Sequence, residues 1–295
     1  MKIYLFPNLS KTNCTKYTVS TCEILHKYGI ELYISDAYRS DFSGISFLNF
    51  DDEDKCIAEC DIIIAIGGDG TILKCAVKAS EFKKPILGIN CGRLGFMASL
   101  EHSQLQLLEK LSKGDYTVSK RMMIDVAVKN DSDSEILNFS ALNDVVVDRA
   151  DDCKIADFEV SKEGQLVSSL RADGVIFSTP TGATAYSMSA GGPIIEPDME
   201  CIEFTQICAH SLFARSMIFS ADSCIQVKCH TSSDAHVNLD VDGSKVYRLT
   251  SGDSVVIRKS SKNVMIIDIN GGSFFSSVNS KLMRPLKDVS EELFR

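Results

Sequence analysis

The sequence predicts an α/β fold in its first part and an antiparallel β fold in its second. Between Lys2 and Ile89, short apolar runs alternate with segments of helical period, which is typical of a parallel sheet covered by helices. Near Gly114-Asp115 the pattern changes to closely spaced strands separated by turns. We therefore expect a Rossmann-like parallel α/β domain over residues 1–118 and an antiparallel β domain over 119–272. Residues 273–295 return to a helical pattern, and we expect this tail to pack back on the first domain.

The composition is that of an ordinary globular protein. The chain has 295 residues, 44% hydrophobic and 24% charged, and a net charge of -9, which argues against a general affinity for nucleic acid. No run approaches the ~20 apolar residues of a membrane span, so we expect a cytoplasmic protein that binds no membrane. The eleven cysteines form no CxxC pair, and many lie in apolar runs. This favours buried thiols over a zinc site or a disulfide framework.

The first domain is expected to contain strands and helices in alternation. The expected elements are a strand at Lys2–Phe6, a helix at Tyr17–Lys27, a strand at Glu31–Ser35, a strand at Pro85–Ile89 and a helix at Ser103–Leu111. Residues 36–54 are polar and give little periodic signal. In a parallel sheet of this kind, ligands bind at the carboxyl ends of the strands.

The central feature of this domain is the glycine-rich segment that follows the apolar strand Ile62–Ile66, the third expected strand along the chain. Gly67, Gly68, Asp69, Gly70 and Thr71 lead into a helix whose apolar residues have a period near 3.6. Glycines allow positive φ and close approach to a ligand, and the N–H groups of a helix start favour anions. Asp69 would repel a phosphate unless a metal ion or a hydroxyl proton lay between them. Its alternative role is a turn residue that caps the helix.

A second unusual loop, Asn90–Met97, follows the strand at Pro85–Ile89. It contains two glycines and a single arginine, Arg93, at a strand end. Arg93 is either a solvated surface charge or a contact to phosphate.

The second domain should contain many short strands. The expected strands are 125–128, 135–139, 144–148, 157–161, 166–170, 174–178, 202–208, 217–220, 224–229, 237–241, 246–249, 254–258 and 264–269. Asp242-Gly243 is a strong hairpin signal between two of them.

Two segments of this domain have the composition of a nucleoside site. Asp173–Pro193 ends a strand and continues with hydroxyl-bearing and small residues, a single aromatic residue, Tyr186, and a final Gly-Gly-Pro. Hydroxyls can bind ribose, and Tyr186 can stack on a base. The alternative is a Ser/Thr-rich turn with helix caps. The adjacent Asn143 and Asp144 can bind two hydroxyls, although such a pair is more often only a turn.

Together these segments resemble the NAD kinase family. That family carries a GGDGT turn, an NxGxLGF loop, an Asn-Glu/Asp pair, a DG…STPTGSTAYSLSAGGP segment, an H-S/T-x-x-x-R stretch and an F-D-G hairpin. The matching segments follow in the same order: Gly67–Thr71, Asn90–Phe96, Asn143-Asp144, Asp173–Pro193, His210–Arg215 and Asp242-Gly243. GGDGT alone is weak evidence for this family, because phosphofructokinases and lipid kinases share it. The TPTGATAYSMSAGGP segment is highly specific for it.

The resemblance implies transfer of a phosphoryl group from ATP to the 2′-hydroxyl of the adenosine ribose of NAD, which gives NADP. Asp69 would be the general base, and Gly70 would shape the turn. Asn143 and Asp144 would hold ribose hydroxyls. The other implied NAD-binding residues are Lys154, Arg171, Asp173, Thr184, Ala185, Tyr186, Ser187, Met188 and Ser189. Gly67, Gly68, Thr71 and Arg93 would contact the ATP phosphates.

These loops contain few basic residues, so the donor phosphates should need a divalent cation, for which we expect Mg²⁺. The sequence departs from the family at four positions: Asp144 replaces Glu, Ala183 replaces Ser or Thr, Val241 replaces Phe, and Ser244 replaces Gln. The alternatives are a lipid or sugar kinase of the same superfamily and an NAD-binding sensor without catalysis. The resemblance also suggests a homodimer or homotetramer, and leaves open whether polyphosphate replaces ATP.

Overall fold

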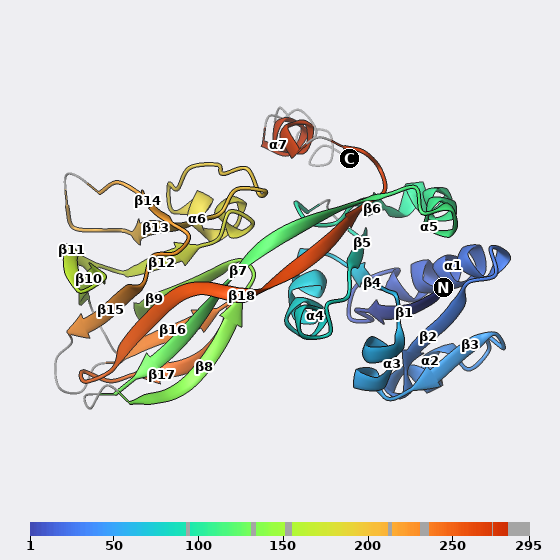
Figure 1. Cartoon of the computed structure of the whole chain (residues 1–295), viewed down its shortest axis with the longest axis horizontal. Coiled ribbons are helices and arrows are strands. Elements are labelled where there is room, and N and C mark those ends of the chain that lie inside the picture. The colour runs from blue at the N-terminus through green and yellow to red at the C-terminus, as the bar shows by residue number, and fades with distance from the viewer. Residues whose placement is uncertain are drawn as a thin grey trace, which may run out of the picture. The chain divides into compact units, whose positions relative to one another are not determined.

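The protein forms two compact units in this computed structural model, which describes residues 1–92, 95–130, 134–150, 155–211, 214–230, 236–272 and 274–282. The first unit is Met1–Ser119 with Met265–Arg295, and the second is Lys120–Val264. Two long strands, β7 (Thr117–Lys129) and β18 (Ser254–Asp268), contribute residues to both units (Figure 1). The division after Val264 precedes the expected boundary at residue 272, because Ile266 of β18 pairs with Ile86 in the sheet of the first unit.

The first unit is built on a parallel sheet, as the sequence predicted. Its strands follow the spatial order β5-β4-β1-β2-β3, and every neighbouring pair is parallel. Beyond β5 the sheet continues with the short β6 (Leu100–Glu101) and with β18, both parallel to β5. The five strands are β1 (Lys2–Pro7), β2 (Glu31–Ser35), β3 (Leu48–Asp51), β4 (Ile62–Gly67) and β5 (Ile86–Asn90). β4 and β5 are buried throughout, in agreement with the apolar sequences that precede their last residues, Gly67 and Asn90.

Helices cover both faces of this sheet. On one face, α1 (Cys14–Lys27), the 3-10 helix η2 (His102–Leu108) and α5 (Glu109–Lys113) supply Leu25, Leu108 and Leu111 to a core that includes Leu87 and Ile89. Because side chains alternate along a strand, Gly88 faces the opposite side. There it lies under Ile72 of α4 (Asp69–Glu81), whose Cδ1 would be 2.5 Å from a Cβ on Gly88. The absence of a side chain at Gly88 thus lets α4 approach the sheet.

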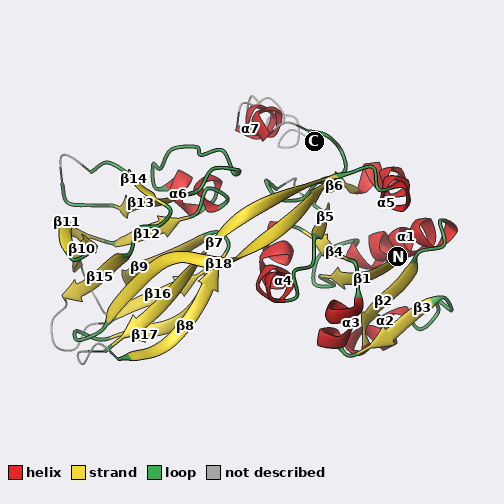
Figure 2. Ribbon diagram, in the orientation of Figure 1, coloured by secondary structure: helices red, strands yellow, loops and turns green. Residues whose placement is uncertain are grey.

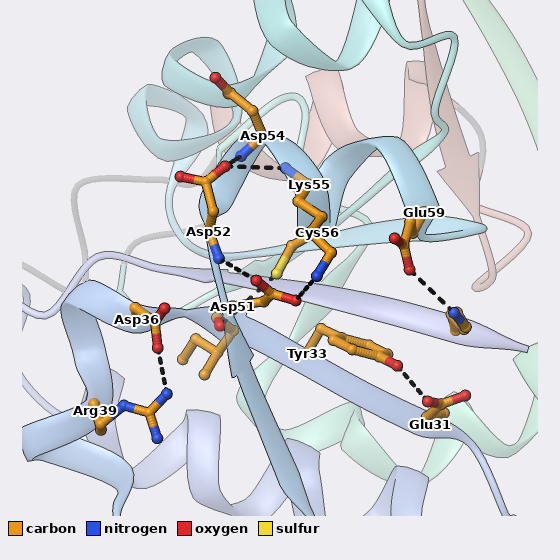
Figure 3. Close-up of polar contacts among 12 residues, drawn as sticks. Glu31, Tyr33, Asp36, Arg39, Asp51, Asp52, Asp54, Lys55, Cys56 and Glu59 are labelled. Carbon is orange, nitrogen blue, oxygen red and sulfur yellow. Dashed lines mark hydrogen bonds and ion pairs between the residues drawn. The ribbon is translucent and has the colours of Figure 1, made fainter.

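The polar stretch that gave no periodic signal is nevertheless structured. It contains the 3-10 helix η1 (Asp36–Tyr38), α2 (Arg39–Phe42) and β3, and leads into α3 (Glu53–Glu59). Asp52 caps α3, because its carboxylate accepts hydrogen bonds from the N–H groups of Asp54 at 3.0 Å and Lys55 at 3.2 Å (Figure 3). The elements are three to seven residues long and are held by polar contacts, so hydrophobic periodicity could not reveal them.

The second unit consists of two antiparallel layers, which confirms the predicted antiparallel β domain. One is a six-stranded sheet with the order β14-β13-β12-β9-β16-β17. Its strands are β9 (Asp144–Arg149), β12 (Gly174–Ser178), β13 (Cys201–Ile207), β14 (Met217–Ser220), β16 (Val237–Val241) and β17 (Ser244–Leu249). The other layer joins β7 and β18 to β8 (Glu135–Ala141), β10 (Ala156–Lys162), β11 (Gln165–Ala172) and β15 (Ile225–His230).

Side chains from both layers form one core. Phe177 of β12 and Phe204 of β13 stack with ring centroids 5.2 Å apart, and Phe158 of β10 and Val227 of β15 belong to the same buried cluster. Among the described residues, the only helices of this unit are the 3-10 helix η3 (Gly182–Thr184) and α6 (Tyr186–Ser189), which both lie in the segment predicted to bind a nucleoside (Figure 2).

The tail begins with a helix, α7 (Phe274–Leu282), as its pattern predicted. The rest of the predicted tail, residues 283–295, and Ser273 lie outside the described residues. None of the helices that the structure describes is long and apolar enough to cross a lipid bilayer.

Candidate active site

In the first unit, three strands end side by side where the sequence predicted a ligand site. Pro7 of β1 is in register with Ile66 of β4, and Gly67 of β4 is in register with Asn90 of β5. The chain after each of these strands therefore starts at the same edge of the sheet. This edge carries the Gly67–Thr71 turn and is the usual ligand-binding edge of a parallel α/β sheet.

The glycines of this turn are explained by close packing and not by the expected positive φ. Gly68 is extended, with φ -165°, and neither Gly67 nor Gly70 has a positive φ. A Cβ on Gly67 would overlap the side chain of Thr71, and a Cβ on Gly68 would lie 2.6 Å from the Lys11 ammonium nitrogen. The turn needs glycine at Gly67 because the buried Thr71 side chain occupies the space, whereas at Gly68 only the mobile tip of the Lys11 side chain would have to move. Gly70 is exposed and has no such neighbour within 4 Å.

Thr71 stabilises the start of α4 from inside the protein. Its side chain is buried, and its hydroxyl oxygen accepts hydrogen bonds from the Gly68 N–H at 3.3 Å and from Asn8 Nδ2 at 3.4 Å. The Asn8 backbone N–H in turn donates to the Ile66 carbonyl at 2.9 Å. The hydroxyl predicted to contact phosphate is thus engaged in holding the turn against the end of β1.

Asp69 is the first residue of α4, and its carboxylate binds the loop that follows β5. It accepts hydrogen bonds from the backbone N–H groups of Phe96 at 2.6 Å, Met97 at 3.2 Å and Ala98 at 3.4 Å. A Cβ on Gly95 would overlap this carboxylate. The two sequence motifs of the first unit are therefore one structure, in which the loop wraps the Asp69 carboxylate and Gly95 allows the contact.

Lys11 is a basic residue at this turn that the sequence analysis missed. It lies in the loop between β1 and α1, where its N–H donates to the Asn8 carbonyl at 3.1 Å, and its exposed side chain reaches over Gly68. The parallel register could have indicated it, because a loop after β1 must lie beside a loop after β4. Arg93, the predicted phosphate contact, and Lys154, a predicted NAD contact, lie outside the described residues.

In the second unit, the Asp242-Gly243 hairpin holds the Asn143-Asp144 pair in place. The Asp242 carboxylate accepts hydrogen bonds from the backbone N–H groups of Leu142 at 2.9 Å, Asn143 at 2.7 Å and Asp144 at 3.2 Å. Asp242 and Gly243 both have positive φ, 48° and 75°, as the predicted two-residue hairpin requires. The Asp242 side chain therefore acts as an acceptor that holds the backbone of residues 142–144 in place.

The end of the β12 strand packs on the same pair. Thr179 donates from its backbone N–H to the Asn143 carbonyl at 2.9 Å and from its hydroxyl to the Leu142 carbonyl at 2.6 Å. A Cβ on Gly182 would overlap the Asn143 backbone. Two motifs that are far apart in the sequence, the Asp242-Gly243 hairpin and the Asp173–Pro193 segment, thus converge on the Asn143-Asp144 pair.

This convergence gives the pair unusual electrostatics. Asp144 is only 5% exposed, and burial, together with the charges of Asp242 and Asp240, raises the pKa of Asp144 to about 7. The buried side-chain oxygen of Asn143 has no hydrogen-bond partner. Near neutral pH the pair can therefore accept hydrogen bonds through Asn143 and either donate or accept them through Asp144, which suits recognition of hydroxyl groups.

The residues of the nucleoside segment divide into exposed and buried sets. Tyr186 is 44% exposed and Ser189 is exposed, while Ala185 and Met188 are partly exposed. Thr184 is nearly buried, and its hydroxyl donates to the Thr181 carbonyl at 3.4 Å. Tyr186 and Ser189 have the side chains best exposed for contact with a ligand.

Ser187, another predicted NAD contact, points into the protein. It is fully buried, and its hydroxyl lies 2.8 Å from Glu203 and 2.9 Å from Thr205. The hydroxyl is therefore engaged in the interior of the second unit.

The side chains of Arg171 and Asp173 each form an ion pair with a residue of a neighbouring strand. The Arg171 guanidinium binds both carboxylate oxygens of Asp157, at 2.7 and 2.8 Å, and lowers the pKa of that carboxyl. Asp173 accepts a hydrogen bond from Arg149 Nε at 2.9 Å. All four side chains are partly exposed, so a ligand could exchange with these partners.

Family models match most of the chain. The ATP-NAD kinase N-terminal domain matches residues 8–116, and the ATP-NAD kinase C-terminal domain matches residues 142–269. The chain belongs to the ATP-NAD kinase family. Its motifs are thus those of the family that the sequence resembled, and the chain is a member of a family of enzymes.

Individual relatives agree over nearly the full length. The NAD kinase of Natranaerobius thermophilus is 36% identical over 283 residues, which cover 94% of this chain and 96% of the relative. The NAD kinase of Clostridium beijerinckii is 38% identical over 248 residues, which cover 83% of this chain and 86% of the relative.

Solved structures share the fold. A yeast NADH kinase crystallised with NADH superposes with a TM-score of 0.86 at 23% identity, covering 97% of this chain and 88% of that one. An NAD kinase of Archaeoglobus fulgidus in complex with ATP gives a TM-score of 0.69 at 22% identity, covering 96% and 98%. At these identities the likeness establishes the architecture.

Proposed function

We propose that this protein transfers the γ-phosphoryl group of ATP to the 2′-hydroxyl of the adenosine ribose of NAD, producing NADP. Membership of the ATP-NAD kinase family supports ATP and NAD as the two substrates. The observation that carries the assignment is the convergence of the Asp242 hairpin and the Thr179–Gly182 segment on Asn143 and Asp144. This convergence fixes an amide with a buried oxygen and a buried carboxyl as a pair suited to a diol.

In this proposal Asn143 and Asp144 hold ribose hydroxyls, and Tyr186 and Ser189 contact the nucleoside. The unpartnered Asn143 oxygen gains a donor when a hydroxyl binds, which removes the cost of a buried acceptor without a partner. The exposed face of Tyr186 offers a surface on which a base can stack.

Asp69 is proposed as the general base on the 2′-hydroxyl. A carboxylate offers about four acceptor positions. The three backbone N–H groups of Phe96, Met97 and Ala98 occupy part of this capacity and orient the group, which leaves room for a hydrogen bond from the attacking hydroxyl. Phosphoryl transfer depends mainly on such positioning and on charge neutralisation.

Asp69→Asn tests this role. Loss of a base of this kind costs about 10²–10⁴ in kcat. The asparagine side chain also has only one oxygen to accept hydrogen bonds from the backbone of the loop. The loop contact must therefore be monitored separately, by the thermal stability of the variant. A kcat close to that of the wild type would remove Asp69 from the role of base. A fall in stability with little change in kcat would make it an anchor for the loop alone.

The donor phosphates are proposed to lie at the start of α4. The N–H groups at the start of α4, beside Gly67 and Gly68, offer hydrogen bonds, and the Lys11 ammonium over Gly68 adds a positive charge. Among the described residues, no group of three Asp, Glu, His or Cys side chains is arranged to hold a metal ion. We therefore propose that Mg²⁺ arrives bound to ATP, coordinated mainly by phosphate oxygens and water.

The deciding experiment is the formation of NADP from NAD with ATP and Mg²⁺, run beside reactions with polyphosphate as donor and with NADH as acceptor. Formation of NADP that stops when Mg²⁺ is chelated would establish the kinase and its metal requirement. Binding of NAD by calorimetry without NADP from either donor would indicate an NAD sensor instead. Light scattering of the same preparation would test the proposed homodimer or homotetramer.

A further inference from the structure

Glu203 is a buried carboxyl group beneath the nucleoside segment. It lies in the middle of β13, in register with Ser178 of β12 and Ile218 of β14, and is 0% exposed. It belongs to none of the motif segments described above. A carboxyl in such a position is costly unless its charge is removed or compensated.

Glu203 joins a compact group of hydroxyls that reaches the helix α6. Its Oε1 lies 2.8 Å from the Ser187 hydroxyl and 3.0 Å from the Thr205 hydroxyl. The two hydroxyls are 2.9 Å apart, and Thr205 lies 2.8 Å from the Ser216 hydroxyl. A Cβ on Gly192 would overlap both Glu203 Oε1 and the Ser187 hydroxyl, so the Gly-Gly-Pro end of the segment packs on the same group.

The number of hydrogens in this group indicates the protonation state of Glu203. Four oxygen pairs lie within hydrogen-bond distance, but the three hydroxyls supply only three hydrogens. A protonated Glu203 supplies the fourth. Ser187 then donates to Thr205, Thr205 to Oε1, Oε1 back to Ser187, and Ser216 to Thr205, so that every contact contains one hydrogen.

Two other observations support a neutral Glu203. Its second oxygen, Oε2, is buried and has no hydrogen-bond partner, which is far more costly for a charged carboxylate than for an acid. Burial raises the pKa of the Glu203 carboxyl. The strands on both sides place uncharged Ser178 and Ile218 opposite it, and α6 presents Ser187. The thiol of Cys201 lies two residues earlier on the same strand, and burial raises its pKa, so it adds no charge near Glu203 at neutral pH.

We infer that Glu203 is a positioning residue that, as a neutral carboxylic acid, holds α6 through Ser187 and thereby fixes the exposed Tyr186 and Ser189 for the adenosine part of the acceptor. This inference rests on the proposed function only for the identity of the ligand. The neutral acid and its hold on α6 follow from the geometry of the second unit alone.

The protonation state is tested by infrared spectroscopy at pH 8. The wild type should show the carbonyl stretch of a protonated carboxylic acid that disappears in Glu203→Gln and persists in Glu200→Gln. Glu200 is a matched control, because it lies three residues earlier, is exposed and pairs with Lys259. No difference between the wild type and Glu203→Gln would overturn the neutral acid.

The positioning role is tested by enzyme kinetics and hydrogen exchange. Glu203→Ala should raise the KM for NAD roughly tenfold, which corresponds to a loss of about 1.4 kcal/mol of binding free energy. The kcat and the KM for ATP should change little. Amide exchange over residues 182–192 should become faster. Glu203→Gln, which keeps the shape and can donate at the Oε1 position, should restore both values.

If amide hydrogen exchange over residues 182–192 is unchanged in Glu203→Ala, the positioning role is overturned, whichever kinetic constants are measured. If the wild type makes no NADP, the proposed function fails, but the infrared and exchange measurements still decide the role of Glu203.

Discussion

Replacement of Asp144 by asparagine should stabilise the protein in a manner that depends on pH. Asp144 is held beside the carboxylates of Asp242 and Asp240 in a site that excludes water, and its pKa is raised from 3.8 to about 7. In the unfolded chain the group titrates near 3.8. Between pH 4 and pH 7 the folded state therefore binds more protons than the unfolded state. The free energy of unfolding consequently falls as the pH rises through this window and levels off above about pH 7.

The size of the effect follows from the same two values. One pH unit corresponds to about 1.36 kcal/mol, so keeping Asp144 ionised at pH 8 costs the fold at most about 4 kcal/mol. Asp144→Asn removes this cost. The variant should exceed the wild type in free energy of unfolding by an amount that is small at pH 4, grows through pH 7 and is then constant.

Urea denaturation at pH 4, 5, 6, 7 and 8 measures this difference directly. Asp222→Asn is the control for loss of a negative charge at the surface, because Asp222 is exposed in the turn between β14 and β15. A stability gain of Asp144→Asn that is equal at pH 5 and pH 8 would refute the argument, because it could not come from the ionisation of Asp144. In the proposed enzyme the gain should come with a higher KM for NAD, since the carboxyl no longer binds the ribose.

Other substitutions test the turn of the first unit. Gly95→Ala should destabilise the protein by about 1–3 kcal/mol and lower kcat, because the new methyl group overlaps the Asp69 carboxylate. Gly92→Ala, in the same loop with open space around it, should change the thermal midpoint little, and equal effects of the two would contradict the contact. Lys11→Ala should raise the KM for ATP roughly 10–100-fold, since a hydrogen bond to a charged group contributes ~1.5–3 kcal/mol. Lys16→Ala, exposed on α1, should leave it unchanged; an ATP KM insensitive to Lys11→Ala would place the triphosphate elsewhere.

The large elements of the fold were predictable because they carry strong periodic signals. β4 and β5 are apolar up to their last residues, and the change to closely spaced strand patterns after Gly114 marked the second fold. The elements between residues 36 and 54 were not predictable. They are short, and polar contacts such as the Asp52 cap hold them, so they leave no hydrophobic period.

The site was predictable as a set of segments but not as a set of contacts. Sequence motifs marked the segments around Asp69 and Asn143. They could not show that Asp69 binds the backbone of Phe96. That contact joins the segments after β4 and β5, which only the parallel register of these two strands brings together. Likewise, nothing in the pattern indicates that Ser187 points inward, since that depends on a carboxyl on a neighbouring strand.

The pairing of β18 with β5 has a consequence for how the chain is synthesised. Along its outer side, β5 is paired with β6 at Ile89 and with β18 at Ile266, opposite Ile86. Ribosomes add about 5–20 residues per second, so roughly 10–35 s pass between the appearance of Ile86 and that of Ile266. During that time the amino-terminal half of this buried, apolar strand waits for its partner while the whole second unit is being made. The nascent chain therefore carries an open strand edge while 180 of its 295 residues, from Ile86 to Ile266, are added, and we expect chaperones to bind this edge.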